Sequence, residues 1–385
     1  MEVIVILLLL LFGYLFLNQF KNKISENNFT NLGYLFVYHL IFGLYFYFFI
    51  KGDASGYWRG SKNLTYEEFV HYFKNDQGTY FVLALNYFPA KVLDLSYFAG
   101  TIIYSLIGFI GLTYFYLIAI ALIPKNSKVN GYYLFPFLFF LPNLHFWSCA
   151  VGKDVILFFC IALFCYGLLN PIKRIHFIII GLVLSYLIRP HITLFMLLGF
   201  GFANFSGKRL SLFQRVIFIS SFIGIAFLIF PLVLKFSKIE EASLDAFQEF
   251  STNKVSLLSR SHTGSSINIS NSPFIVKIFS FLFRPFLLDI NSFPSLLAAI
   301  ENSILLFLTI KYFSKKPFES FRNSPFLLQG MVYFLLLGTF AFSQSLGNLG
   351  VMIRMRNMFL PGLIIFFLWH FSYLQNEKLK VENEP

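Results

Sequence analysis

Two arginines one residue apart, Arg354 and Arg356, lie at the start of the last apolar segment of the chain and are followed by Pro361. A guanidinium group matches phosphate oxygens with two parallel hydrogen bonds, so the pair could hold a phosphate group. The alternative is that both side chains anchor the segment to anionic lipid head groups. We treat both arginines as candidate phosphate ligands.

Two Arg-Pro pairs interrupt other apolar stretches. Arg189-Pro190 is followed by His191, and Arg284-Pro285 lies inside the segment 274–290. Because proline ends a helix and leaves backbone groups without partners, the neighbouring polar side chains are candidates for a binding site. Arg284 must reach the interface, pair with Asp289 or bind an anion. His191 is equally compatible with a structural hydrogen bond.

Two carboxylates follow glycines at the ends of apolar segments. Asp53 lies between Gly52 and Ala54, and Asp154 belongs to the turn Gly152-Lys153-Asp154. A carboxylate in such a position can act as a general base toward a hydroxyl group. Lys153 can attract a phosphate as a point charge. The competing interpretations are a turn aspartate at position 53 and an internally paired turn at 153–154.

The composition requires a lipid environment for the segments around these residues. The 385 residues are 57% hydrophobic and 12% charged, whereas soluble domains contain about 25% charged residues. The net charge of +12 does not indicate nucleic-acid binding, since the basic residues lie in loops between apolar runs. The cysteines show no metal-ligand spacing and no carboxylate cluster is visible, so no cofactor is expected and a divalent metal is not implied.

The apolar runs predict an all-α polytopic membrane protein with about eleven transmembrane helices. An interfacial or re-entrant helix is expected near 274–290, within a single membrane domain 1–374 that a tail 375–385 follows. The expected spans are 2–19, 32–50, 98–123, 132–151, 154–170, 175–189, 191–205, 214–234, 292–311, 326–344 and 357–374.

The distribution of Lys and Arg over the short loops predicts the orientation of these spans. It places the N-terminus outside, the tail in the cytoplasm, and the long loops 51–97 and 235–291 on the outer side. With this topology, all the polar residues described above face the same side of the membrane. A pocket built from several helix ends on the outer face is the simplest explanation.

Several of these elements resemble known membrane enzymes. The Gly52-Asp53-Ala54 element with Tyr57 resembles the first outer loop of GT-C-type glycosyltransferases, in which an acidic residue is the catalytic base. The Arg-x-Arg element before a proline-containing late helix also recurs among them. The Trp-Ser…Gly-Lys-Asp turn at 147–154 and the Arg-Pro-Phe element at 284–286 are similar to those of EpsG-like and Wzy-like polysaccharide polymerases.

The resemblance implies a bacterial inner-membrane glycosyltransferase or O-antigen, capsule or exopolysaccharide polymerase that uses a polyprenyl-linked glycan. It implies that Asp53 is the base, and Asp154 is the candidate for the second acid that such enzymes often carry. The candidate donor-binding residues are Lys153, Arg189, His191, Arg284, Arg354 and Arg356. The alternatives are a transporter of the same lipid-linked glycan and a non-catalytic partner of other envelope assembly proteins.

Overall fold

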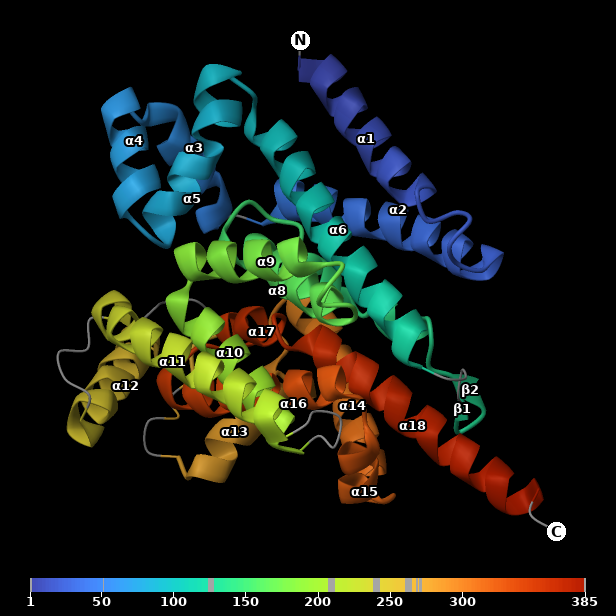
Figure 1. Ribbon diagram of the computed structural model, residues 1–385. Helices are drawn as coiled ribbons and strands as arrows, with labels where there is room; N and C mark the ends of the chain where they lie inside the picture. Colours follow the sequence, from blue (N-terminus) through green and yellow to red (C-terminus); the bar gives the residue numbers. More distant parts are fainter. Residues whose placement is uncertain are drawn as a thin grey trace. The chain divides into compact units, whose positions relative to one another are not determined.

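A computed structural model describes residues 2–50, 52–123, 128–206, 212–237, 243–259, 265–267, 269 and 272–383. The chain forms two compact units, which we describe separately. Unit 1 contains residues 1–118 and 144–189, and unit 2 contains residues 119–143 and 190–385. Nearly all regular structure is helical (Figure 1).

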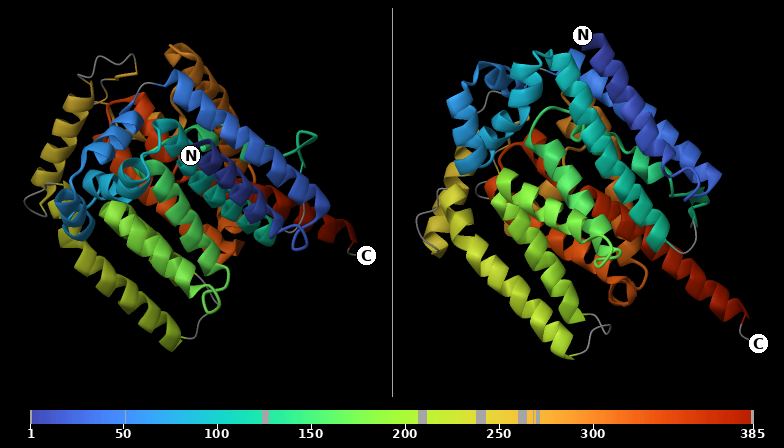
Figure 2. Two further views of the ribbon diagram at one scale, coloured as in Figure 1. Left: turned by 90° about the horizontal axis from the view of Figure 1, so that it is seen from above. Right: turned by 45° about the horizontal axis from the view of Figure 1, so that its top comes forward.

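Unit 1 begins with two long apolar helices and continues with a group of short helices in the segment 51–97. The elements are α1 (Glu2–Asn18), α2 (Glu26–Phe49), α3 (Asp53–Asn63), α4 (Tyr66–Asn75), α5 (Thr79–Asn86), the π-helix η1 (Tyr87–Val92), most of α6 (Tyr97–Leu122), most of α7 (Pro142–Phe146), α8 (Lys153–Leu168) and α9 (Ile175–Ile188). Helices α8 and α9 form an antiparallel hairpin, drawn in green in Figure 2.

Unit 2 contains a small hairpin and the remaining helices. The elements are β1 (Lys128–Val129), β2 (Tyr132–Tyr133), the 3-10 helix η2 (Phe137–Phe140), α10 (Pro190–Ser206), α11 (Leu212–Ser237), α12 (Leu244–Ser259), α13 (Phe274–Phe283), the 3-10 helix η3 (Leu287–Asp289), α14 (Phe293–Phe313), α15 (Pro317–Asn323), α16 (Phe326–Ser345), α17 (Leu349–Arg356) and α18 (Leu360–Asn383). Helix α16 packs against α10, α13 and α18.

The apolar helices identify a membrane protein. Among the described residues, four helices are long and apolar enough to cross a bilayer, namely α2, α6, α14 and α16. Helices α17 and α18 meet the same test together but are bent by 60° at their junction. On α1, large apolar side chains such as Leu7 and Leu8 are 61% and 58% exposed, as a lipid-facing helix requires.

The helices follow the apolar runs of the sequence except at 132–151, where the expectation of a continuous membrane-spanning helix is wrong. This segment instead forms β2, η2 and α7. Pro136 and Pro142 each lack the backbone N–H that a continuous helix needs. Before them, Asn130 and Gly131 have φ values of 52° and 88° and connect β1 to β2, as Asn-Gly does in tight hairpins.

The end of the irregular segment, from residue 144 onward, packs against α6 within unit 1. Ser148 and Cys149 contact α6 at Gly108 and Ser105. Phe158 contacts it further along, at Gly111 and Phe115, and Tyr166 contacts it at Tyr114. From residue 148 onward the chain therefore runs in the same direction as α6. The chain has therefore returned along α6 by residue 148 without a continuous helix. The contact is close because α6 has no side chain at Gly108, where a Cβ would lie 1.7 Å from the Ser148 carbonyl oxygen.

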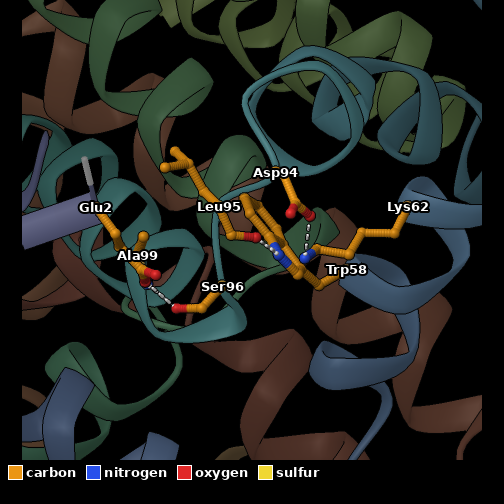
Figure 3. A network of polar contacts seen from close by, with 7 residues as sticks. All are labelled: Glu2, Trp58, Lys62, Asp94, Leu95, Ser96 and Ala99. Carbon is orange, nitrogen blue, oxygen red and sulfur yellow. Dashed lines mark hydrogen bonds and ion pairs between the residues drawn. The ribbon is translucent and has the colours of Figure 1, made fainter.

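The segment 51–97 is fastened to the start of α6 by a polar network (Figure 3). The Trp58 indole donates to the Leu95 carbonyl at 3.0 Å, and Lys62 pairs with Asp94 at 2.8 Å. Ser96 also donates to the carboxylate of Glu2 at the beginning of α1. The start of α1 and the start of α6 consequently lie at the same end of unit 1.

We expect Gly108→Ala to destabilise the protein, because the new methyl group overlaps the backbone of the irregular segment. Overpacking of this kind typically costs about 1–3 kcal/mol. The matched control is Gly33→Ala on α2, where a Cβ meets no atom within 4 Å. Thermal unfolding of the purified protein in detergent should show a lower melting temperature for Gly108→Ala only. Equal melting temperatures for the two variants would contradict this packing.

Candidate functional site

The candidate residues of unit 1 gather at one end of helices α3, α5, α8 and α9. Lys153, the first residue of α8, donates a hydrogen bond to the Thr79 hydroxyl at the start of α5, with a length of 3.0 Å. Its ammonium group also lies 5.9 Å from the centre of the Tyr57 ring on α3. Side chains from α3 and α5 thus surround the ammonium group of Lys153 at the start of α8.

Glycine makes the turn before Lys153 possible. Gly152 has φ of 152° and ψ of −173°, a conformation that is essentially restricted to glycine. A Cβ at this position would lie 3.6 Å from the Tyr57 ring, so space is not what requires glycine here. The backbone conformation requires it, and it directs the chain into α8 with Lys153 beside Tyr57.

The neighbouring acid, Asp154, is paired with Arg189. The two charged groups are 3.1 Å apart, and their side chains are 9% and 11% exposed. Arg189 ends α9, where a positive charge also interacts favourably with the helix dipole. The structure therefore places Asp154, next to Lys153 in the sequence, against Arg189, and a shared role of the three in binding stays a prediction.

Asp53 differs from Asp154 in its exposure. It is the first residue of α3, it is exposed, and it lies one helical turn before Tyr57 on the same helix. Asp53 is therefore an exposed carboxylate one helical turn from Tyr57, whose ring lies beside Lys153. Tyr57, which the sequence analysis named only as part of the resemblance, and Thr79, which it did not name, complete this group. The spacing of four residues from Asp53 to Tyr57 was the available signal for Tyr57.

The candidates of unit 2 occupy different environments. His191 lies in the first turn of α10, half-buried against the rings of Phe195 and Phe342, with centroid distances of 6.1 and 6.0 Å. Arg354 is half-buried on α17. These positions are described within unit 2 only, and a pocket shared with Asp53 stays a prediction.

Arg284 pairs with Asp289, one of the three alternatives that the sequence left open. Its Nε donates to Asp289 Oδ2 at 3.0 Å, and its Nη2 donates to Oδ1 of the same carboxylate. Asp289 also accepts the backbone N–H of Phe286 at 2.9 Å. The hydrogen bond from Arg284 lowers the pKa of Asp289, and the same bond raises the pKa of Arg284. The pair closes the turn between α13 and α14.

Arg356 is buried, at 2% exposure, and is bonded to protein acceptors. Its guanidinium donates to the Phe281 carbonyl at 3.2 Å, to the Leu282 carbonyl, and to the amide oxygen of Asn302. These two carbonyls belong to the last turn of α13, where carbonyl groups have no hydrogen-bond donor within the helix. The side chain predicted to hold phosphate thus caps the buried end of a helix.

A hydrogen bond from the Asn302 amide places the turn after α13 beside the middle of α14. Its nitrogen donates to the Pro285 carbonyl at 2.9 Å. Asn302 lies nine residues after Phe293, which is roughly 13 Å along the helix. The chain must return over this distance between Pro285 and the start of α14. An interfacial or re-entrant position of 274–290 in the membrane stays a prediction.

No group of three or more His, Cys, Asp or Glu side chains that could hold a metal ion occurs in the described part of the chain. Comparisons with protein-family models, with curated proteins and with solved structures gave no match. The function must therefore be argued from the residues themselves.

We expect Asp154→Asn to destabilise the protein strongly. Removing one partner of a buried ion pair leaves the other charge uncompensated and typically costs about 3–5 kcal/mol. The control is Asp94→Asn, since Asp94 is 85% exposed and its ion pair with Lys62 should contribute less than about 1 kcal/mol. Thermal unfolding in detergent measures both variants.

The double variant Asp154→Asn/Arg189→Gln removes both charges and should recover part of the lost stability. A loss for Asp154→Asn no larger than that for Asp94→Asn would mean that the pair between α8 and α9 is not a stabilising contact.

Proposed function

We propose that this protein is a membrane-embedded glycosyltransferase or glycan polymerase. Its donor would be a sugar on polyprenyl phosphate or pyrophosphate, used at the outer face of a bacterial inner membrane to assemble exopolysaccharide, capsule or O-antigen. The observation that carries the proposal is the group at one end of unit 1, where the exposed carboxylate of Asp53 lies one helical turn before Tyr57, and the Tyr57 ring lies 5.9 Å from the Lys153 ammonium group. A general base and a cation for phosphate are the two groups that this reaction needs.

The proposed reaction assigns different tasks to the charged residues. Asp53 takes the proton of the acceptor hydroxyl, whose oxygen then forms a bond to the anomeric carbon of the donor sugar. The bond from that carbon to the phosphate oxygen breaks, and Lys153 stabilises the negative charge that develops on the phosphate. Asp154 holds Arg189 in place at 3.1 Å, so that Arg189 contributes a fixed positive charge beside Lys153.

The proposed topology keeps the N-terminus outside and the C-terminus in the cytoplasm. The return of the chain before residue 148 supplies one crossing without a continuous helix, which preserves the odd number of about eleven crossings. The shorter apolar helices α1, α8, α9, α10 and the apolar part of α11 supply crossings beside the long ones. Asp53, Lys153 and Arg189 then face the outer side together.

The second candidate function is transport of the same lipid-linked glycan. Unit 2 favours it, because α17 and α18 form a helix pair broken by a 60° bend, and Arg356, a buried ionisable residue, lies at the break. Discontinuous helices with buried ionisable groups are typical of the binding sites of transporters. Under this function, Asp53 has no role as a base.

The decisive experiment compares Asp53→Asn with Glu67→Gln in purified full-length protein. Asn keeps the size of the side chain and loses the basic oxygen, so transfer from a polyprenyl-linked donor should fall roughly 10²- to 10⁴-fold. Glu67 is an exposed carboxylate on α4 of the same outer segment, and its replacement should leave the rate unchanged. Protein yield and melting temperature should match in both variants.

Unchanged transfer by Asp53→Asn would refute the assignment of Asp53 as the base. Movement of a labelled lipid-linked glycan across a proteoliposome membrane, with no new glycosidic bond formed, would favour transport instead.

A further inference from the structure

Unit 2 contains a carboxyl group that the proposed transferase does not use. Glu301 lies near the middle of α14, one of the helices long and apolar enough to cross a membrane, and its side chain is fully buried. An ionised side chain at the centre of a membrane helix is energetically costly. A residue of this kind at this depth therefore requires an explanation from its surroundings.

The two carboxyl oxygens of Glu301 differ in their hydrogen bonding. Oε2 accepts the backbone N–H of Asn143, at the start of α7, with a length of 2.8 Å. Oε1 is buried and has no hydrogen-bond partner among the described residues. An ionised carboxylate only accepts hydrogen bonds and is stabilised by donors on both oxygens, whereas a protonated carboxyl accepts at its carbonyl oxygen and has an O–H group in place of the second acceptor.

Arg356 is the charged group that acts on Glu301, and its donors are directed elsewhere. They bond to the carbonyls of Phe281 and Leu282 and to the amide oxygen of Asn302. The guanidinium is therefore stabilised by protein acceptors without a direct ion pair to Glu301. No salt bridge to Glu301 occurs within the described ranges of the chain.

The other elements packed against α14 carry titratable groups with partners of their own. On η3, Asp289 is bound by Arg284, and on α18, His370 is hydrogen-bonded to Ser320 at 2.8 Å. On α13, the titratable group is Lys277, which is half-buried. None of these groups forms an ion pair with Glu301 in the described part of the chain.

We propose that the carboxyl group of Glu301 is a proton-binding site, with the proton carried on Oε1. A proton is the ligand that this geometry admits, because it needs no cavity and removes the uncompensated charge. The step is the reversible addition of one proton to the carboxylate. The proposal does not depend on glycosyl transfer by unit 1. Ionisable groups at this depth form the proton relays of pumps and transporters, so the site gives unit 2 a function of its own.

Infrared spectroscopy of the purified full-length protein tests the site directly. At neutral pH the wild type should show the carbonyl stretch of a protonated, buried carboxylic acid. Glu301→Gln should lack this band, and Glu67→Gln, which changes an exposed carboxylate, should retain it. A wild-type spectrum without the band, or a band that persists in Glu301→Gln, would overturn the proposal. Loss of the wild-type band on titration to alkaline pH supports the proposal without relying on the variant.

Stability provides a second readout. Gln keeps an acceptor for the Asn143 N–H and carries no charge at any pH. If the folded state binds a proton at Glu301, the wild type should lose stability as the pH is raised and this proton is released. The melting temperature of Glu301→Gln should not follow that decline. Parallel dependence of the two melting temperatures on pH would show that Glu301 does not bind a proton in the folded protein.

Discussion

Backbone N–H and C=O groups within a bilayer have no water to bond, so each must find its partner inside the protein. A continuous helix meets this requirement by itself, but the ends of α13 and α17 are buried in unit 2. Arg356 closes the last turn of α13 by donating to the carbonyls of Phe281 and Leu282. The Asn302 amide donates a hydrogen bond to the Pro285 carbonyl, which lies just beyond the end of α13. These bonds allow a short helix to end inside the unit.

The same requirement shapes the irregular part of unit 1. The segment after Pro142 passes along α6 with few helical hydrogen bonds of its own. The Ser105 hydroxyl on α6 donates to the Cys149 carbonyl at 3.2 Å, and Gly108 allows the backbone at Ser148 to come close. His39 and His145, both fully buried, are joined through their Nδ1 atoms at 3.1 Å. Side chains from neighbouring helices therefore replace the partners that a helix would have provided.

These structural demands separate the charged residues into two kinds. Arg284 and Arg356 are bonded to an acid and to carbonyls, and these bonds explain their presence in an apolar region without a ligand. Asp53 is exposed and Lys153 is half-buried at helix ends in unit 1, and both lie near Tyr57, which suits them to a substrate. The proposed chemistry therefore depends on unit 1, while the buried centre of unit 2 supplies the separate proposal for Glu301.

The sequence by itself determined that this protein needs a lipid environment, and it determined most of the helices. Long apolar runs are stable in lipid almost only as helices, which pair their own backbone groups. The prediction of a membrane-spanning helix over 132–151 was wrong, and local signals in the sequence argue against that helix. These signals are the turn residues Asn130-Gly131 and the prolines Pro136 and Pro142. The pairing of Arg284 with Asp289 was predictable as an alternative, because the partners are five residues apart.

Only the tertiary structure decided the partners of Arg356, Lys153 and Glu301. Arg356 bonds to Phe281 across 75 positions of the chain, Lys153 to Thr79 across 74, and Glu301 to Asn143 across 158. The residue types and their spacing indicate that a charge is present. Whether it is bound within the protein or accessible to a substrate depends on distant segments that packing brings together, and no local pattern in the sequence specifies them.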